Sequence, residues 1–224
     1  MKKALRFLKL DFITVKPYFT WKNLFLILAV PVLLMFFTDA GMGMLFFLMG
    51  YGALFVSYPF AVGEQNGIDA LYVTLNVRRK EVVLGRYLFA LCTDVFTCVV
   101  GIACMVAVSA LKSIDLDWRT VFPVSCAALA FFSLVQAVQL PLFFRFGYAK
   151  AKILSMLPFL AVPVFVFLYD RAYRGEGAVR LLTEFGNWID ANNLLALAIA
   201  AVLWVFIMFI SYDISCLQYR KRDF

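Results

Sequence analysis

Six long apolar runs decide what this chain can fold into. A transmembrane helix needs about 20 predominantly apolar residues to cross the hydrocarbon core of a bilayer. The runs of about this length are residues 22–38, 43–62, 87–111, 120–144, 151–169 and 193–214. They are continuous rather than alternating, which argues against a β-barrel. With 64% apolar residues and 25 Phe, the chain exceeds what one soluble core of this length can bury. We therefore expect an all-α, polytopic membrane protein, with residues 1–224 forming one domain.

Basic residues predict how these helices are oriented. Lys and Arg in short loops stay on the cytoplasmic side of a membrane. With six spans and both termini on one side, that side receives 16 of the 21 Lys and Arg residues. Both termini are therefore expected to be cytoplasmic. The formal net charge of +7 is then explained by attraction to anionic lipid, and no nucleic-acid partner is expected.

Residues that would support catalysis are scarce. The chain has no His, which excludes Ser-His triads and histidine metal sites. Cys92, Cys98 and Cys104 recur every six residues, so neighbouring thiols lie about 120° apart around a helix and cannot share one metal ion. The sequence contains no GxxxxGK[ST] loop for ATP. We therefore expect a non-catalytic chain that binds no metal and no cofactor of its own.

The N-terminal segment, residues 1–17, predicts a basic amphipathic helix. Its apolar residues fall on one helical stripe, and most of its lysines avoid that stripe. Pro17 breaks the helix before the first apolar run. Such a helix lies in the membrane interface, either as an elbow that braces the membrane helices or as a simple topogenic anchor.

A charged insert, residues 63–86, separates the second and third apolar runs. After a polar turn from Glu64 to Gly67, its apolar residues follow the i, i+3, i+4, i+7 spacing of a short helix with one apolar face. These residues are Ile68, Leu71, Tyr72 and Leu75. On the cytoplasmic side, such a face must cover lipid or a groove of another protein. An ordinary connecting loop is the alternative.

Inside the predicted spans, Asp94 is the side chain that costs most to bury, about 2.5–3.5 kcal/mol at the centre of a helix. It should face protein or water. Gln136 and Gln139 lie three residues apart on one face of the fourth span and could hydrogen-bond it. The group serves either as a polar clamp between helices or as part of a substrate path.

The run FAVGEQNGIDALYVTLNVRRKEVVLGRY, residues 60–87, resembles the segment between the second and third spans of ABC-2 type transporter permeases. These are small six-span subunits that act with separate ATPase subunits. The family pattern is an acidic residue followed by a run similar to LY.TLPV.R..VV.GRY. The residues that match it are Leu71, Tyr72, Thr74, Leu75, Val77, Arg78, Val82, Val83, Gly85, Arg86 and Tyr87. Asn76 departs from it, because many relatives have Pro there.

The resemblance implies that residues 63–86 form a coupling helix, which docks into a groove of the ATPase and moves when ATP closes the nucleotide-binding dimer. The apolar contact would be made by Ile68, Leu71, Tyr72 and Leu75, and the polar rim by Glu64, Asp69, Arg78 and Arg79. Residues 1–17 would be the elbow helix. ATP and Mg would be bound by the partner chain.

The resemblance also implies an assembly and a function. Two permeases, identical or homologous, would carry two ATPase subunits in the plasma membrane of a bacterium. Relatives export amphipathic peptides, including antimicrobial and toxin-like ones, so export of an amphipathic substrate is expected here. The alternative is a non-transporting membrane scaffold or assembly subunit whose cytoplasmic helix docks another protein.

Overall fold

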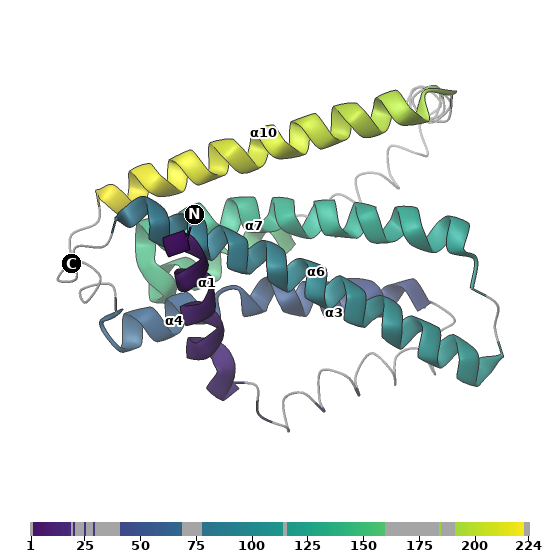
Figure 1. The fold of residues 1–224 in the computed structure, drawn as a ribbon, viewed down its shortest axis with the longest axis horizontal. Coiled ribbons are helices and arrows are strands. Elements are labelled where there is room, and N and C mark those ends of the chain that lie inside the picture. The colour runs from purple at the N-terminus through teal and green to yellow at the C-terminus, as the bar shows by residue number, and fades with distance from the viewer. Residues whose placement is uncertain are drawn as a thin grey trace.

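The computed structural model describes residues 2–18, 20, 25, 29, 41–68, 78–113, 116–159, 184 and 191–221. The regular structure of these residues is entirely helical (Figure 1). In chain order the elements are α1 (Lys2–Val15), the 3₁₀ turn η1 (Lys16–Tyr18), α3 (Gly41–Phe55), α4 (Tyr58–Gln65), α6 (Arg79–Lys112), α7 (Trp118–Leu154) and α10 (Asn193–Arg220). The predicted all-α class is confirmed for this part of the chain.

Four stretches within the described ranges are helical, long and apolar enough to cross a membrane. They are Gly43–Gln65, Arg79–Lys112, Trp118–Leu154 and Leu195–Arg220. They correspond to the second, third, fourth and sixth predicted spans. The first predicted span, 22–38, lies outside the described residues except for positions 25 and 29, and the fifth, 151–169, leaves them after residue 159. Six spans therefore stay a prediction.

Helix α6 is the centre of the bundle, because it contacts α1, α3, α7 and α10. Two glycines allow α3 and α6 to approach closely. A methyl group added at Gly52 would lie 2.8 Å from the Thr97 side chain, and one added at Gly101 would lie 2.8 Å from Leu45. Small residues at such crossings let membrane helices pack without a gap.

Aromatic rings from α4, α7 and α10 pack together at one end of the bundle. The ring of Phe60 lies 5.1 Å from Phe143 and 5.0 Å from Phe144, measured between centroids. Tyr219 of α10 adds an edge-to-face contact with Phe144. Pairs of this kind contribute about 0.5–1.5 kcal/mol each beyond the burial of their area. These contacts join α4 and α10 to α7.

Helix α1 covers most of the predicted N-terminal segment, residues 1–17, and η1 contains Pro17. Val15 is fully buried, whereas Phe12 is 44% exposed although its ring lies 4.9 Å from Phe89. The predicted apolar stripe is thus only partly covered by the bundle. The interface position of this helix stays a prediction.

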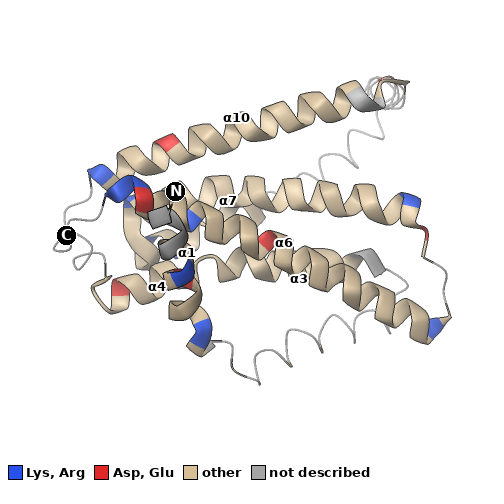
Figure 2. Ribbon diagram, viewed as in Figure 1, with Lys and Arg blue, Asp and Glu red and all other residues tan. Residues whose placement is uncertain are grey.

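Most Lys and Arg residues of the long helices lie near the helix ends (Figure 2). Figure 2 shows most Lys and Arg at the end that carries both chain termini, with fewer at the opposite end. Helix α6 has 34 residues and is therefore about 50 Å long at 1.5 Å per residue, longer than the hydrocarbon core of about 30 Å. Its charged ends can reach water on both sides.

Candidate functional site

Only the two edges of the predicted coupling segment are described. Glu64 lies in the last turn of α4, and Ile68 follows Gly67, whose φ is 62°. Ile68 is half-buried and packs against the main core of this chain. The other expected contact residues, Asp69, Leu71, Tyr72 and Leu75, lie outside the described residues. Of the four residues of the predicted apolar face, the structure therefore describes only the first, Ile68.

Glu64 binds the start of a helical piece at the end of α7. Gly147 interrupts α7 with φ 74° and ψ 175°, which begins a new helical piece whose first N–H groups have no intrahelical acceptor. Tyr148 and Ala149 donate two of these N–H groups to the Glu64 carboxylate, the second at 3.2 Å. A carboxylate is favoured there because it also meets the positive end of the helix dipole.

Arg79 binds the C-terminal end of a helix, whereas Glu64 binds an N-terminal end. Its guanidinium Nη1 donates to the backbone carbonyls of Tyr219 at 2.8 Å and Arg220 at 2.6 Å, in the last turn of α10. A cation stabilises the negative end of a helix dipole. Arg78 is exposed and precedes α6 in extended conformation. The insert is therefore fastened through Glu64 to α7 and through Arg79 to α10.

An ion pair at the same end of the bundle was not predicted from the sequence. Arg86 Nη1 lies 3.4 Å from Asp11 Oδ1, and both side chains are about 5% exposed. The guanidinium also lies 4.6 Å above the Phe60 ring, at cation–π distance. The sequence does mark Asp11 as unusual. It lies four residues before Val15, a residue of the apolar stripe, so it falls on the apolar face of the basic helix.

Asp94 lies between α6 and α7, away from lipid. Gln136 donates through Nε2 to Asp94 Oδ1 at 2.6 Å, and both residues are at most 1% exposed. Within the described part of the chain, Asp94 Oδ2 and Gln136 Oε1 have no hydrogen-bond partner. Gln139 does not reach Asp94, since its Nε2 donates to the Ser155 carbonyl at 2.9 Å. The geometry is that of a buried clamp between two helices.

A chain of hydroxyl groups, also unforeseen, joins three helices. Ser211 donates to the Ala137 carbonyl at 2.5 Å, and the Tyr87 hydroxyl lies 2.5 Å from Ser211 Oγ and 2.9 Å from Ser215 Oγ. These contacts link α6, α7 and α10. No three Cys, Asp or Glu side chains gather into a metal site within the part of the chain that the structure describes.

One comparison with known proteins gives a match. A family model described as "ABC-2 family transporter protein" matches residues 6–220. This range contains α3, α4, α6, α7 and α10 together with the whole insert between α4 and α6. No curated protein and no solved structure was found to match the chain.

Proposed function

Since the chain belongs to the ABC-2 family of transporter membrane proteins, we propose that it is the membrane subunit of an ATP-binding cassette exporter. Permeases of this family work with ATP-binding partners and are generally non-catalytic membrane components. In this proposal the ATP and Mg are bound by the partner chains, and this chain forms one permease domain over residues 1–224.

The attachment of the insert at both ends supports a coupling role for residues 63–86. Glu64 joins the insert to the helical piece after Gly147, and Arg79 joins it to the end of α10. A push on the insert would therefore be transmitted to two separate helices of the bundle. The ATPase-binding set that we propose is Glu64, Ile68, Asp69, Leu71, Tyr72, Leu75, Arg78 and Arg79. Within it, Glu64 and Arg79 act mainly by positioning the segment.

The arrangement in the membrane is part of the same proposal. Both termini lie in the cytoplasm of a bacterial cell, α1 is the elbow helix at the inner face, and α4 leads into the coupling segment. Two copies of the permease, or this chain and a homologue, pair and carry two ATPase subunits. The cargo is an amphipathic molecule, such as a peptide or an antimicrobial or toxin-like compound.

A double variant tests the coupling role. Leu71→Asp with Tyr72→Asp places charge in the centre of the proposed apolar contact, where anchor residues carry about 2 kcal/mol or more each. The variant should insert and purify normally, while recovery of the ATPase and transport fall together. The matched control is Arg145→Asp with Lys150→Asp, which places two new Asp residues at exposed positions on the same side, outside the insert.

The test also separates the exporter from a scaffold. An exporter should co-purify with an ATPase and lose it in the double variant. Co-purification of a protein without ATPase activity through the same face would instead support a scaffold subunit. Wild-type stoichiometry and transport in the double variant would show that this face is not the coupling element.

A further inference from the structure

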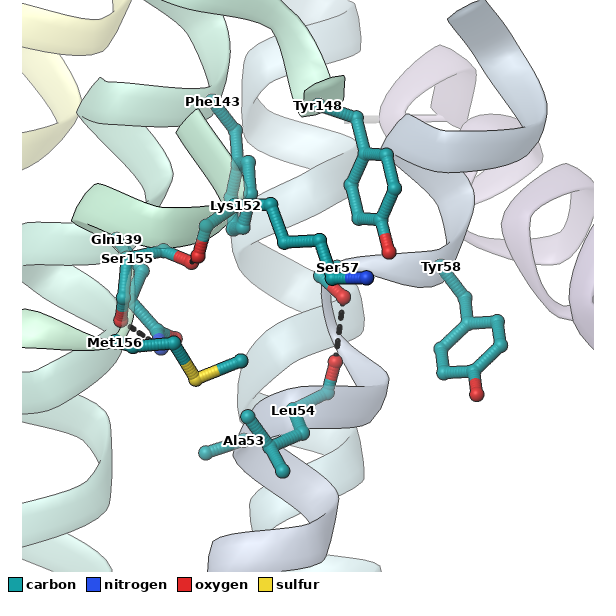
Figure 3. Close-up of a pocket in the computed structure, with 10 residues that line it drawn as sticks. All are labelled: Ala53, Leu54, Ser57, Tyr58, Gln139, Phe143, Tyr148, Lys152, Ser155 and Met156. Atoms are coloured by element: carbon teal, nitrogen blue, oxygen red, sulfur yellow. Dashed lines mark hydrogen bonds between the residues drawn. The ribbon is translucent and has the colours of Figure 1, made fainter. Parts of the chain in front are cut away.

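A pocket of about 180 Å³ lies between the corner joining α3 and α4 and the last turns of α7 (Figure 3). Its walls include the aromatic rings of Phe143 and Tyr148 and the side chain of Met156. The volume is below the roughly 300 Å³ at which pockets for drug-sized ligands begin. It suits one small head group rather than a folded peptide.

One side of the pocket favours an anion. Among the described residues that line it, Lys152 is the only charged one, and its Nζ lies 5.9 Å from the centroid of the Tyr148 ring. Figure 3 shows the Lys152 side chain extended toward Ser57, with the Tyr148 hydroxyl nearby. Ser57 already donates its hydroxyl proton to the Leu54 carbonyl at 2.7 Å. Lys152 is therefore the charged donor available to a ligand on this side.

The other side of the pocket holds a buried acceptor without a donor. Gln139 is 2% exposed, and its amide nitrogen is engaged by the Ser155 carbonyl. Its Oε1 accepts no hydrogen bond from the residues that the structure describes. A buried acceptor left in this state costs about 1–3 kcal/mol. A ligand that carries a hydroxyl or ammonium group would satisfy it.

Apolar side chains continue outward from the pocket. Ile153 and Leu157, on either side of the lining residues Ser155 and Met156, are 81% and 55% exposed. In a membrane protein such side chains meet acyl chains, while a lysine near a helix end extends its charge to the interface. The pocket thus combines a polar interior with an apolar approach.

We propose that this pocket binds the head group of a membrane phospholipid, with the phosphate at Lys152 and a head-group hydroxyl or ammonium at Gln139. The shared chemistry is a phosphate ester beside a hydrogen-bond donor. The pocket lies next to the coupling segment, because its lining residue Tyr148 also donates its N–H to Glu64. Its occupancy requires neither the ATPase nor transport.

Native mass spectrometry of the full-length permease in detergent tests the site with short-chain lipids. Dihexanoyl phosphatidylglycerol supplies both the phosphate and donor hydroxyls. Dihexanoyl phosphatidylcholine lacks the donor, dihexanoylglycerol lacks the phosphate, and inorganic phosphate lacks the lipid. Phosphatidylglycerol should bind about tenfold more tightly than each of the other three, because each lacks one contact worth about 1.4 kcal/mol or more.

Two matched variants locate the binding. Lys152→Met keeps the apolar stem and removes the charge, so it should weaken phosphatidylglycerol binding about tenfold. Lys150→Met makes the same change two residues away, outside the pocket lining, and should leave binding unchanged. Equal losses in both variants would indicate general charge attraction and overturn the site. Equal binding of phosphatidylcholine would overturn the role of Gln139, and equal binding of inorganic phosphate would overturn a lipid ligand.

Unliganded melting temperatures check that both variants are folded. Because no ATPase is present in these measurements, their outcome is independent of the test of the proposed exporter.

Discussion

Buried polar side chains define this molecule at the scale of single residues. The pair of Arg86 and Asp11 and the pair of Asp94 and Gln136 both cross between helices with almost no exposure. Removing one partner of such a pair leaves the other buried without compensation. These pairs therefore select one arrangement of helices that are otherwise covered with similar apolar surfaces.

Substitutions at Asp94 separate a clamp from a transport role. Asp94→Asn keeps an acceptor for Gln136, so the melting temperature in detergent should change little. Asp94→Leu removes the acceptor and should destabilise the fold by about 1–3 kcal/mol. If Asp94→Asn matches the wild type in both stability and transport, Asp94 acts only as a clamp. Loss of transport at unchanged stability would assign it to the substrate path.

At the scale of elements, the break in α7 is what lets Glu64 of the insert contact α7. Gly147 adopts a left-handed φ of 74°, which residues with a Cβ rarely adopt. The helical piece after it presents its N–H groups to α4. The contact depends on one carboxylate, so it is testable by mutation.

Glu64→Ala removes this carboxylate. We expect a loss of about 0.5–2 kcal/mol in stability, the usual value of a helix cap. Transport per ATP hydrolysed should fall while the ATPase still co-purifies, because the segment would dock without moving α7. Gln65→Ala, an exposed neighbour, is the control and should behave as wild type. Normal coupling in Glu64→Ala would show that this contact is only structural.

The packing of α3 against α6 and α7 predicts different effects for two glycine substitutions. Gly101→Ala places a methyl group 2.8 Å from Leu45 Cδ1 and 3.4 Å from its Cα, and should destabilise the protein by about 1–3 kcal/mol through overpacking. Gly50→Ala meets Phe132 at 3.6 Å, an ordinary contact, and should be neutral or stabilising. Thermal unfolding in detergent compares them. Equal melting temperatures would mean that the helices can separate at no cost.

At the scale of the whole molecule, the position of the charges predicts how the protein sits in the membrane. The last turns of α7, which contain Ala149, lie at the end of the bundle with the termini, and the first turn, which contains Arg119, lies at the opposite end (Figure 1). In a background with all five cysteines replaced, Ala149→Cys should react only with reagents supplied from the cytoplasm, and Arg119→Cys only with reagents from outside. Labelling of both from one side would exclude a membrane-spanning α7.

The outer face of α10 is the other feature at this scale. Only 11% of the most apolar part of α10 is buried by the rest of this chain. Lipid or a second subunit therefore covers the remainder. A complex of two permeases and two ATPases should carry twice the permease mass of 25.4 kDa beside two ATPase chains. A mass that corresponds to one of each would contradict the proposed pairing.

The sequence by itself determined the class of this protein, because apolar runs of the length of a bilayer leave a chain no soluble alternative. It also indicated Asp94 and Gln136 as neighbours, since a charge in hydrocarbon requires a polar partner. The family followed from residues 60–87, where the pattern is dense enough to be specific, and the family match over residues 6–220 confirms it.

Only the tertiary structure decided which partners the other polar residues take. Glu64 contacts Tyr148 across 84 positions and Arg79 contacts Tyr219 across 140, and no local pattern contains such distances. Gln139 shares a helix face with Gln136, yet it donates to the Ser155 carbonyl and not to Asp94. Ser155 lies within reach because α7 breaks at Gly147 and the chain turns back. Helical spacing specifies which residues share a face. The packing of one helix against another decides what that face meets.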